Sequence, residues 1–120
     1  MLSTKENREP EAIKIRASVL GSIARLAALE TKGVIGMSLK PWRRLLGTLG
    51  FGKFDEGVRV KFKESDIKLT TSLLVEYGAD IPLVASAVAD NVKKAIEKMT
   101  GITSLDIVVD VRGVVKAKSQ

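Results

Sequence analysis

A glycine-rich stretch near the middle of the chain has the spacing of a phosphate-binding loop. Residues 47–53 are GTLGFGK and fit the pattern GxxxxGK, in which backbone amides and a lysine hold the phosphates of ATP or GTP. In working loops the lysine precedes Ser or Thr, which binds Mg²⁺, and a helix follows. Here Phe54 follows Lys53, and the next pattern is a strand beginning near Val58. The stretch therefore predicts an exposed glycine-rich loop rather than a nucleotide site.

The same stretch contains GxxG at residues 47–50, the pattern with which KH modules clamp an RNA backbone. A KH loop joins two helices, and no helical pattern follows this one. Trp42 and Phe51 could stack on bases, but apolar loop residues more often pack on their own domain. RNA binding through this loop and a basic strand stays open as the alternative function.

Few other residues could carry chemistry. The chain has no cysteine and no histidine, which removes disulfides, thiolate ligands and the usual proton carrier at neutral pH. Glu76, Tyr77 and Asp80 form a polar cluster, but Asp80 suits a helix cap and Tyr77 a strand residue packed at the sheet edge. We therefore expect no enzymatic activity, no cofactor and no metal site.

The charge balance favours anionic partners. The net charge is +6, with 20 Lys+Arg against 14 Asp+Glu, which favours acidic partners such as nucleic acid or anionic lipid without choosing between them. The basic residues gather in segment 39–56 and along one predicted strand. The expected partner-binding residues are Lys40, Trp42, Arg43, Arg44, Lys53, Arg59, Lys61 and Lys63. Neither a signal peptide nor an integral membrane segment is predicted, so we expect a cytoplasmic protein.

Periodicity divides the chain into strands and helices. With 120 residues and 45% hydrophobic content, one compact domain over residues 12–114 is expected, with a disordered segment 1–11 and a basic tail 115–120. Alternation predicts strands over 12–17, 34–38 and 105–112 and a hairpin over 57–77, and helical spacing predicts helices over 18–30 and 81–99. Segment 39–56 has no sustained period and is interpreted as a basic, glycine-rich insert.

The predicted order is β-α-β-β-β-α-β, with a core supplied mainly by the hairpin and the second helix. Ser18 and Asp80 are expected to cap the helices, with Pro82 in the second helix's first turn. Gly33 and Gly101 are expected to end the helices and Gly78 the hairpin. In the first helix the expected apolar stripe includes Val19, Ile23, Leu26 and Ala27, and Leu20 and Ala24 broaden it. The expected core is Val58, Val60, Phe62, Leu69, Leu73, Val84, Val88, Val92 and Ile96.

Two helices with one apolar stripe each predict an α+β fold, a two-layer sandwich with both helices on one face of a mixed sheet. Strand order does not follow from the sequence.

Three segments, taken in order, resemble the alkaline shock protein family of Gram-positive and related bacteria. They are IKIRASVLGSIARLAALETKGVIGMS, VEYGADIPLVASAVADNVKKAIEKMTG and LDIVVDVRGV, and the resemblance covers Ala12 to Val114 apart from the insert. Leu83 stands where an acidic residue often follows the Ile-Pro pair. The resemblance implies a non-enzymatic cytoplasmic protein of envelope stress response that self-associates and gathers at the membrane by binding a membrane-anchored partner. It assigns no catalytic or ligand residues.

Overall fold

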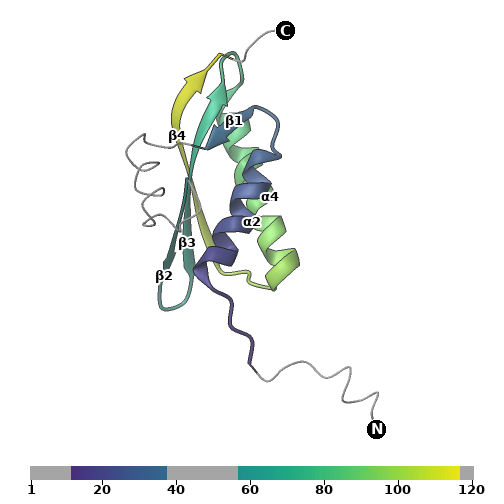
Figure 1. Cartoon of the computed structure of the whole chain (residues 1–120), viewed down its shortest axis with the longest axis vertical. Helices are drawn as coiled ribbons and strands as arrows, with labels where there is room; N and C mark the ends of the chain where they lie inside the picture. Colours follow the sequence, from purple (N-terminus) through teal and green to yellow (C-terminus); the bar gives the residue numbers. More distant parts are fainter. Residues whose placement is uncertain (1–11, 38–56, 117–120) are drawn as a thin grey trace, which may run out of the picture.

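The computed structural model describes residues 12–37 and 57–116. In Figure 1 both helices lie on one face of the sheet, which is the predicted two-layer α+β arrangement. The elements, in chain order, are α2 (Ala17–Leu29), β1 (Val34–Met37), β2 (Val58–Phe62), β3 (Ile67–Glu76), α4 (Ile81–Thr100) and β4 (Leu105–Val115).

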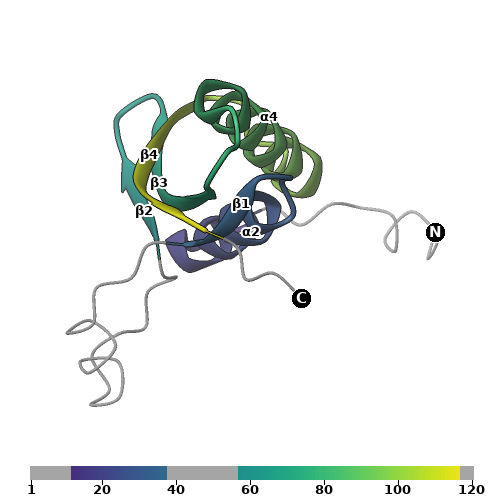
Figure 2. The ribbon, with the colours of Figure 1, turned by 90° about the horizontal axis from the view of Figure 1, so that it is seen from above.

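Strand β3 is the centre of the sheet, because each of the other strands pairs with it. β4 runs parallel to β3 along its whole length, from Ile67 opposite Leu105 to Glu76 opposite Val115. β1 and β2 are antiparallel to β3 and therefore share its other edge, with β2 on residues 67–71 and β1 on residues 73–75. The sheet is mixed, as predicted, and Figure 2 shows its strands curving around the helix pair.

The end of β1 and the start of β2 meet at one place on this shared edge. Gly57 has a φ of +84°, and a Cβ added to it would lie 2.7 Å from the Met37 Cβ. Its carbonyl accepts a backbone hydrogen bond from Ser72 N of β3 at 2.7 Å. The chain therefore leaves the sheet at Met37 and returns to it beside the same point.

The core lies between β3 and the two helices. Alternate residues of β3 are fully buried, because they face the helices: Leu69, Thr71, Leu73 and Val75. In α4 the buried residues recur every fourth position: Val84, Val88, Val92 and Ile96. In α2 the buried face is made mostly of small side chains, which allow close packing: Leu20, Gly21, Ile23, Ala24, Ala27 and Ala28.

Buried hydroxyl groups have partners. Thr71 Oγ1 donates to the Val108 carbonyl of β4 at 3.2 Å. Thr31 Oγ1 donates to the Ala27 carbonyl at 3.0 Å and accepts from Asn91 Nδ2 at 2.9 Å, which joins the end of α2 to α4. Each bond offsets the desolvation of a polar group that would otherwise destabilise the core.

Helix α4 begins and ends at the residues that its sequence predicts. Asp80 is the N-cap, with its Oδ1 accepting from Leu83 N at 3.3 Å, and Pro82 lies in the first turn. Gly101 is the C-cap in the left-handed conformation, with φ 81°. Gly78 also has a positive φ, 96°, in the turn between β3 and α4.

The predicted strand over 12–17 is wrong. Residues 12–16 form no regular structure; Ile15 packs against the core, but Ile13 is 68% exposed, so the alternation does not mark one buried strand face. Both edges of β3 are already paired, so no place next to it remains for this segment. Ser18 does not cap α2, because the N-cap is Arg16, which makes no side-chain capping bond.

Several expected core positions are also wrong. Val19 and Leu26 are 45% and 56% exposed, because the buried stripe of α2 is centred on Leu20, Ala24 and Ala27. Phe62 is 56% exposed, because it lies at the end of β2 beside the hairpin turn. Val58 and Val60 are partly buried against the core. Strand β4 continues to Val115, beyond its expected end near Arg112.

Replacing Val88 with Asp should test the core directly. Val88 is fully buried, so the substitution would place an unpaired carboxylate against the sheet and lower the free energy of unfolding by about 3 kcal/mol or more. Leu83→Asp is the matched control, because Leu83 is exposed in the first turn of the same helix, where a negative charge is favourable. Thermal denaturation of both variants checks this, and equal melting temperatures would contradict the core.

Replacing Gly33 with Ala should destabilise the junction between α2 and β1. Gly33 has a φ of +98°, and an added Cβ would lie 2.6 Å from Val84 Cγ2. We expect a loss of about 1–3 kcal/mol in denaturant unfolding. Gly36→Ala is the control, because nothing lies within 4 Å of its added Cβ, and it should cause no loss. A Gly33→Ala protein as stable as the parent would contradict the strained contact.

Candidate interaction surface

The sheet face turned away from the helices, called the open face below, carries most of the polar strand residues. No described helix or strand covers it (Figures 1 and 2). Strand side chains alternate between faces, so the residues next to each buried position point to this side. The open face consists of Arg59 and Lys61 from β2, Lys68, Thr70, Ser72 and Leu74 from β3, and Asp106, Val108 and Asp110 from β4.

Charge on the open face changes sign from β2 to β4. Lys61 pairs in register with Lys68, and Lys68 pairs in register with Asp106 on the other side. Arg59 lies beside Thr70, which faces Val108, and Ser72 faces Asp110. Cations therefore gather on the β2 side and carboxylates on the β4 side.

The Lys61 and Lys68 pair is unfavourable for folding. Like charges directly opposite one another in an antiparallel ladder repel, and opposite charges attract by a similar amount. Asp106, the register partner of Lys68 on β4, offsets part of this repulsion. The β2 side of the open face therefore holds neighbouring cations at a cost to strand pairing.

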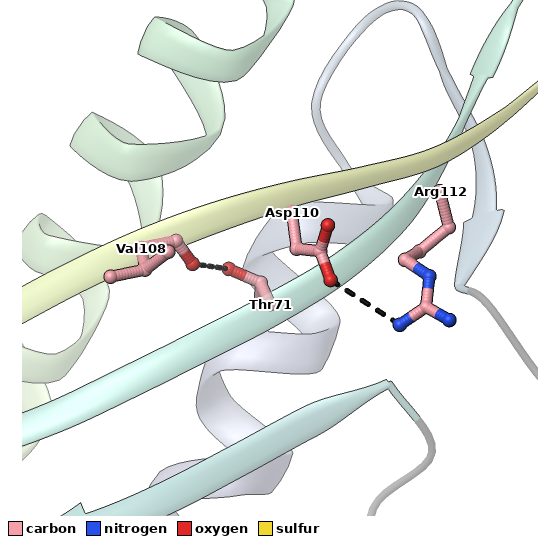
Figure 3. A network of polar contacts seen from close by, with 4 residues as sticks. All are labelled: Thr71, Val108, Asp110 and Arg112. Atoms are coloured by element: carbon pink, nitrogen blue, oxygen red, sulfur yellow. Dashed lines mark hydrogen bonds and ion pairs between the residues drawn. The ribbon is translucent and has the colours of Figure 1, made fainter.

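At the far end of β4, Arg112 forms an ion pair with Asp110 at 3.3 Å (Figure 3). Both side chains are partly exposed, so this pair adds little to stability. Arg112 is the extra residue of a bulge, because Val111 pairs with Leu73 and Gly113 with Leu74. An added Cβ at Gly113 would lie 3.0 Å from Leu74 Cδ2, so the glycine makes room for that side chain.

The structure brings together some of the residues predicted to bind a partner. Arg59 and Lys61 are exposed and share the open face. Lys63 follows the end of β2, and its N–H donates to the Asp66 carbonyl at 2.8 Å in the hairpin turn. The stretch GTLGFGK and the other predicted residues lie outside the described residues: Lys40, Trp42, Arg43, Arg44 and Lys53.

Sequence reasoning missed the contribution of Lys68 and of the carboxylates Asp106 and Asp110. Alternation places Asp106 and Asp110 on one side of their strand, but only the pairing of β4 with β3 puts them beside Lys68. A search for charges at alternating positions of the hairpin's second strand would have found Lys68.

The cluster of Glu76, Tyr77 and Asp80 does not form a packed acid–base site. Asp80 caps α4, and Tyr77 is 70% exposed in the turn after β3, so its expected packing at the sheet edge is wrong. Within residues 12–37 and 57–116, no group of three or more acidic, His or Cys side chains is placed to hold a metal ion. In the same residues, no helix has the length and hydropathy needed to cross a membrane.

Replacing Lys61 with Glu should stabilise the fold, because it turns a like-charge cross-strand pair with Lys68 into an opposite-charge pair. We expect the free energy of unfolding to rise by about 0.2–1 kcal/mol at low salt, and the gain to shrink in 1 M salt. Lys63→Glu, which lies beyond the strand pair, is the control and should show no such gain. A Lys61→Glu protein that melts below the parent would contradict the register.

A family model for the alkaline shock protein 23 family, described as having a cell envelope-related function, matches residues 5–116. Two Bacillus subtilis proteins are similar in sequence: the uncharacterized protein YqhY is 26% identical over 102 residues, covering 85% of this chain and 76% of the relative. The uncharacterized protein YloU is 29% identical over 104 residues, covering 85% of this chain and 87% of the relative.

Among solved structures, a variant of the MamM C-terminal domain superposes with a TM-score of 0.49 at 14% identity, over 82% of this chain and 98% of that domain. At this level the similarity does not extend to function. The family match, in contrast, spans nearly the whole chain and agrees with the motifs in all three resembling segments. This protein therefore belongs to the alkaline shock protein 23 family, whose function is related to the cell envelope.

Proposed function

We propose that this protein is a non-catalytic interaction module of cell-envelope stress response and homeostasis. It works on the cytoplasmic side of the membrane, self-associates, and binds a membrane-anchored protein partner through the β2 side of the open face. The observation that carries this proposal is the gathering of Arg59, Lys61 and Lys68 on an uncovered sheet face. The family's cell envelope-related function gives the context in which that surface acts.

The chemistry of this surface suits an acidic protein segment. Three cations from two neighbouring strands lie within one or two register positions of each other. Cationic side chains at an exposed rim attract an acidic partner and orient it, and such contacts weaken as salt screens the charges. The sequence also predicts partner-binding basic residues in segment 39–56, and these lie outside the described residues.

A nucleic-acid partner is the alternative, and the carboxylates on the open face make it less favourable. On the β4 side of this face, Asp106 is the register partner of Lys68 and repels phosphate groups close to it, while Asp110 is ion-paired with Arg112. A surface that follows an RNA backbone is expected to carry a continuous basic patch or stripe. An acidic protein segment of limited width can avoid these carboxylates by binding on the β2 side.

The double variant Arg59→Glu/Lys61→Glu should lose its recovery in the membrane fraction of cells. The matched control is Lys93→Glu/Lys94→Glu, which changes the same charge on the exposed face of α4. We expect the control to be recovered like the parent, and both variants to melt as folded proteins. Cross-linking in intact cells, followed by identification of the captured protein, measures the partner directly.

Two results would contradict the proposed function. One is membrane recovery of Arg59→Glu/Lys61→Glu that equals the control. The other is capture of RNA by the parent at low salt, lost steeply as salt rises, with no membrane protein captured, which would favour the alternative.

A further inference from the structure

One edge of the sheet is unpaired along a long strand. β4 pairs with β3 on one side, and no described strand pairs with its other side. An edge strand presents a row of backbone N–H and C=O groups that can pair with a strand of another chain. Soluble proteins usually block such edges with short strands, prolines, lysines or bulges.

β4 has few of these protective features. It is 11 residues long, its sequence LDIVVDVRGVV contains no proline and no lysine, and most of its residues favour strands. Its bulge lies at Arg112, near its C-terminal end, which leaves residues 105–111 regular. The long regular part of the edge is therefore open to pairing.

The backbone groups on this free edge belong to identifiable residues. The Ser104 carbonyl accepts from Ile67 N at 3.0 Å, and the Val108 carbonyl accepts from Thr71 Oγ1, so both point toward β3 (Figure 3). Backbone groups alternate in direction along a strand. The N–H and C=O groups of Ile107, Val109 and Val111 consequently point away from β3.

We propose that β4 pairs antiparallel with β4 of a second copy of this chain, around a two-fold axis through Val109. This inference rests on the self-association in the proposed function and names its surface. In this register Val109 faces Val109, and Ile107 faces Val111, so the outward backbone groups of both strands bond to each other. Asp106, on the open face of each copy, lies opposite Arg112 of the other, whose guanidinium contacts Asp110 on that same face.

Charge selects this register over its neighbours. Sliding one β4 along the other by a single residue would put helix-facing side chains opposite open-face ones, which the pleat does not allow. The allowed registers therefore place the two-fold axis on a residue. Centring the axis on Val108 places Asp106 opposite Asp110 twice, and centring it on Asp110 places the two Asp110 carboxylates together. Like charges facing each other destabilise a strand pair. Of these registers, only the axis at Val109 places Asp106 opposite Arg112 while its central pairs, from Ile107 to Val111, stay in the regular part of the strand.

The apolar residues of β4 support the same pairing. Ile107, Val109 and Val111 face the helices but remain partly exposed, because their strand is the last of the sheet. Val108, on the open face, is 37% exposed. A second β4 beside this edge would cover these side chains while bonding the free backbone groups.

A single introduced cysteine tests the axis, because the chain has no cysteine of its own. Val109→Cys should give a disulfide-linked dimer under mild oxidation, since residues facing each other in a bonded pair lie about 5.5 Å apart at Cα. Ile107→Cys is the matched control on the same face. It faces Val111, so the two introduced cysteines lie roughly 13 Å apart and should not cross-link.

A charge swap between two exposed residues tests the register independently of the cysteine variants. Asp106→Arg and Arg112→Asp each create like-charge pairs, and should each weaken dimerisation roughly tenfold in sedimentation velocity. The double variant restores opposite charges and should recover the dimer. Arg59→Glu/Lys61→Glu should leave dimerisation unchanged, because those residues lie across the sheet from β4.

The outcomes separate this inference from the proposed function. A parent chain that stays monomeric at high concentration would overturn both the β4 pairing and the proposed self-association. A parent that associates, while Val109→Cys fails to cross-link and the charge swap has no effect, would overturn only the β4 pairing.

Discussion

The structure depends on β3, the strand with which every other strand of the sheet pairs. Because β4 occupies one edge completely, β1 and β2 must share the other edge end to end. The same strand supplies fully buried residues at alternate positions, and the two helices cover them. A shift of β3 by one residue would turn Leu69, Leu73 and Val75 to the open face. The pairing register of the strands and the packing of the core therefore depend on each other.

Covering one face of the sheet leaves two surfaces with different chemistry. The β2 side of the open face holds cations at a cost to strand pairing, which suits an acidic partner. The free edge of β4 holds unpaired backbone groups and a self-complementary charge order, which suits a second copy. β3 separates these surfaces, so both could be occupied at once.

Because the two surfaces are separate, dimerisation through one could strengthen partner binding through the other. Ion pairs at an exposed surface are individually weak and are screened by salt. If two copies join through β4, each dimer presents two cationic surfaces to a membrane, where anchored partners are held close together. The second contact then becomes intramolecular and strengthens attachment without a new interface. Self-association and partner binding would in this way support each other in a family with a cell envelope-related function.

Local patterns were enough to predict α4 and the β2–β3 hairpin. The Asp80 cap, the fourfold spacing of Val84 to Ile96 and the left-handed Gly101 depend on neighbours in the chain. Period-two alternation likewise predicted which hairpin residues face the helices, apart from Phe62 at its end. Arg59 and Lys61 could be assigned to one surface for the same reason.

Sequence patterns thus predicted every described helix and strand and most facing residues of α4 and the hairpin, because capping bonds and side-chain periods depend on residues close together in the chain. The order of the motifs along the chain indicated the family. Only the folded structure shows that residues 12–16 are not a strand and that Val19 and Leu26 lie outside the buried stripe of α2. It also decided that β4 lies beside β3, which brings Asp106 to Lys68 and leaves an edge free. These features depend on pairing and packing between distant segments, and such contacts leave no periodic signal in the sequence.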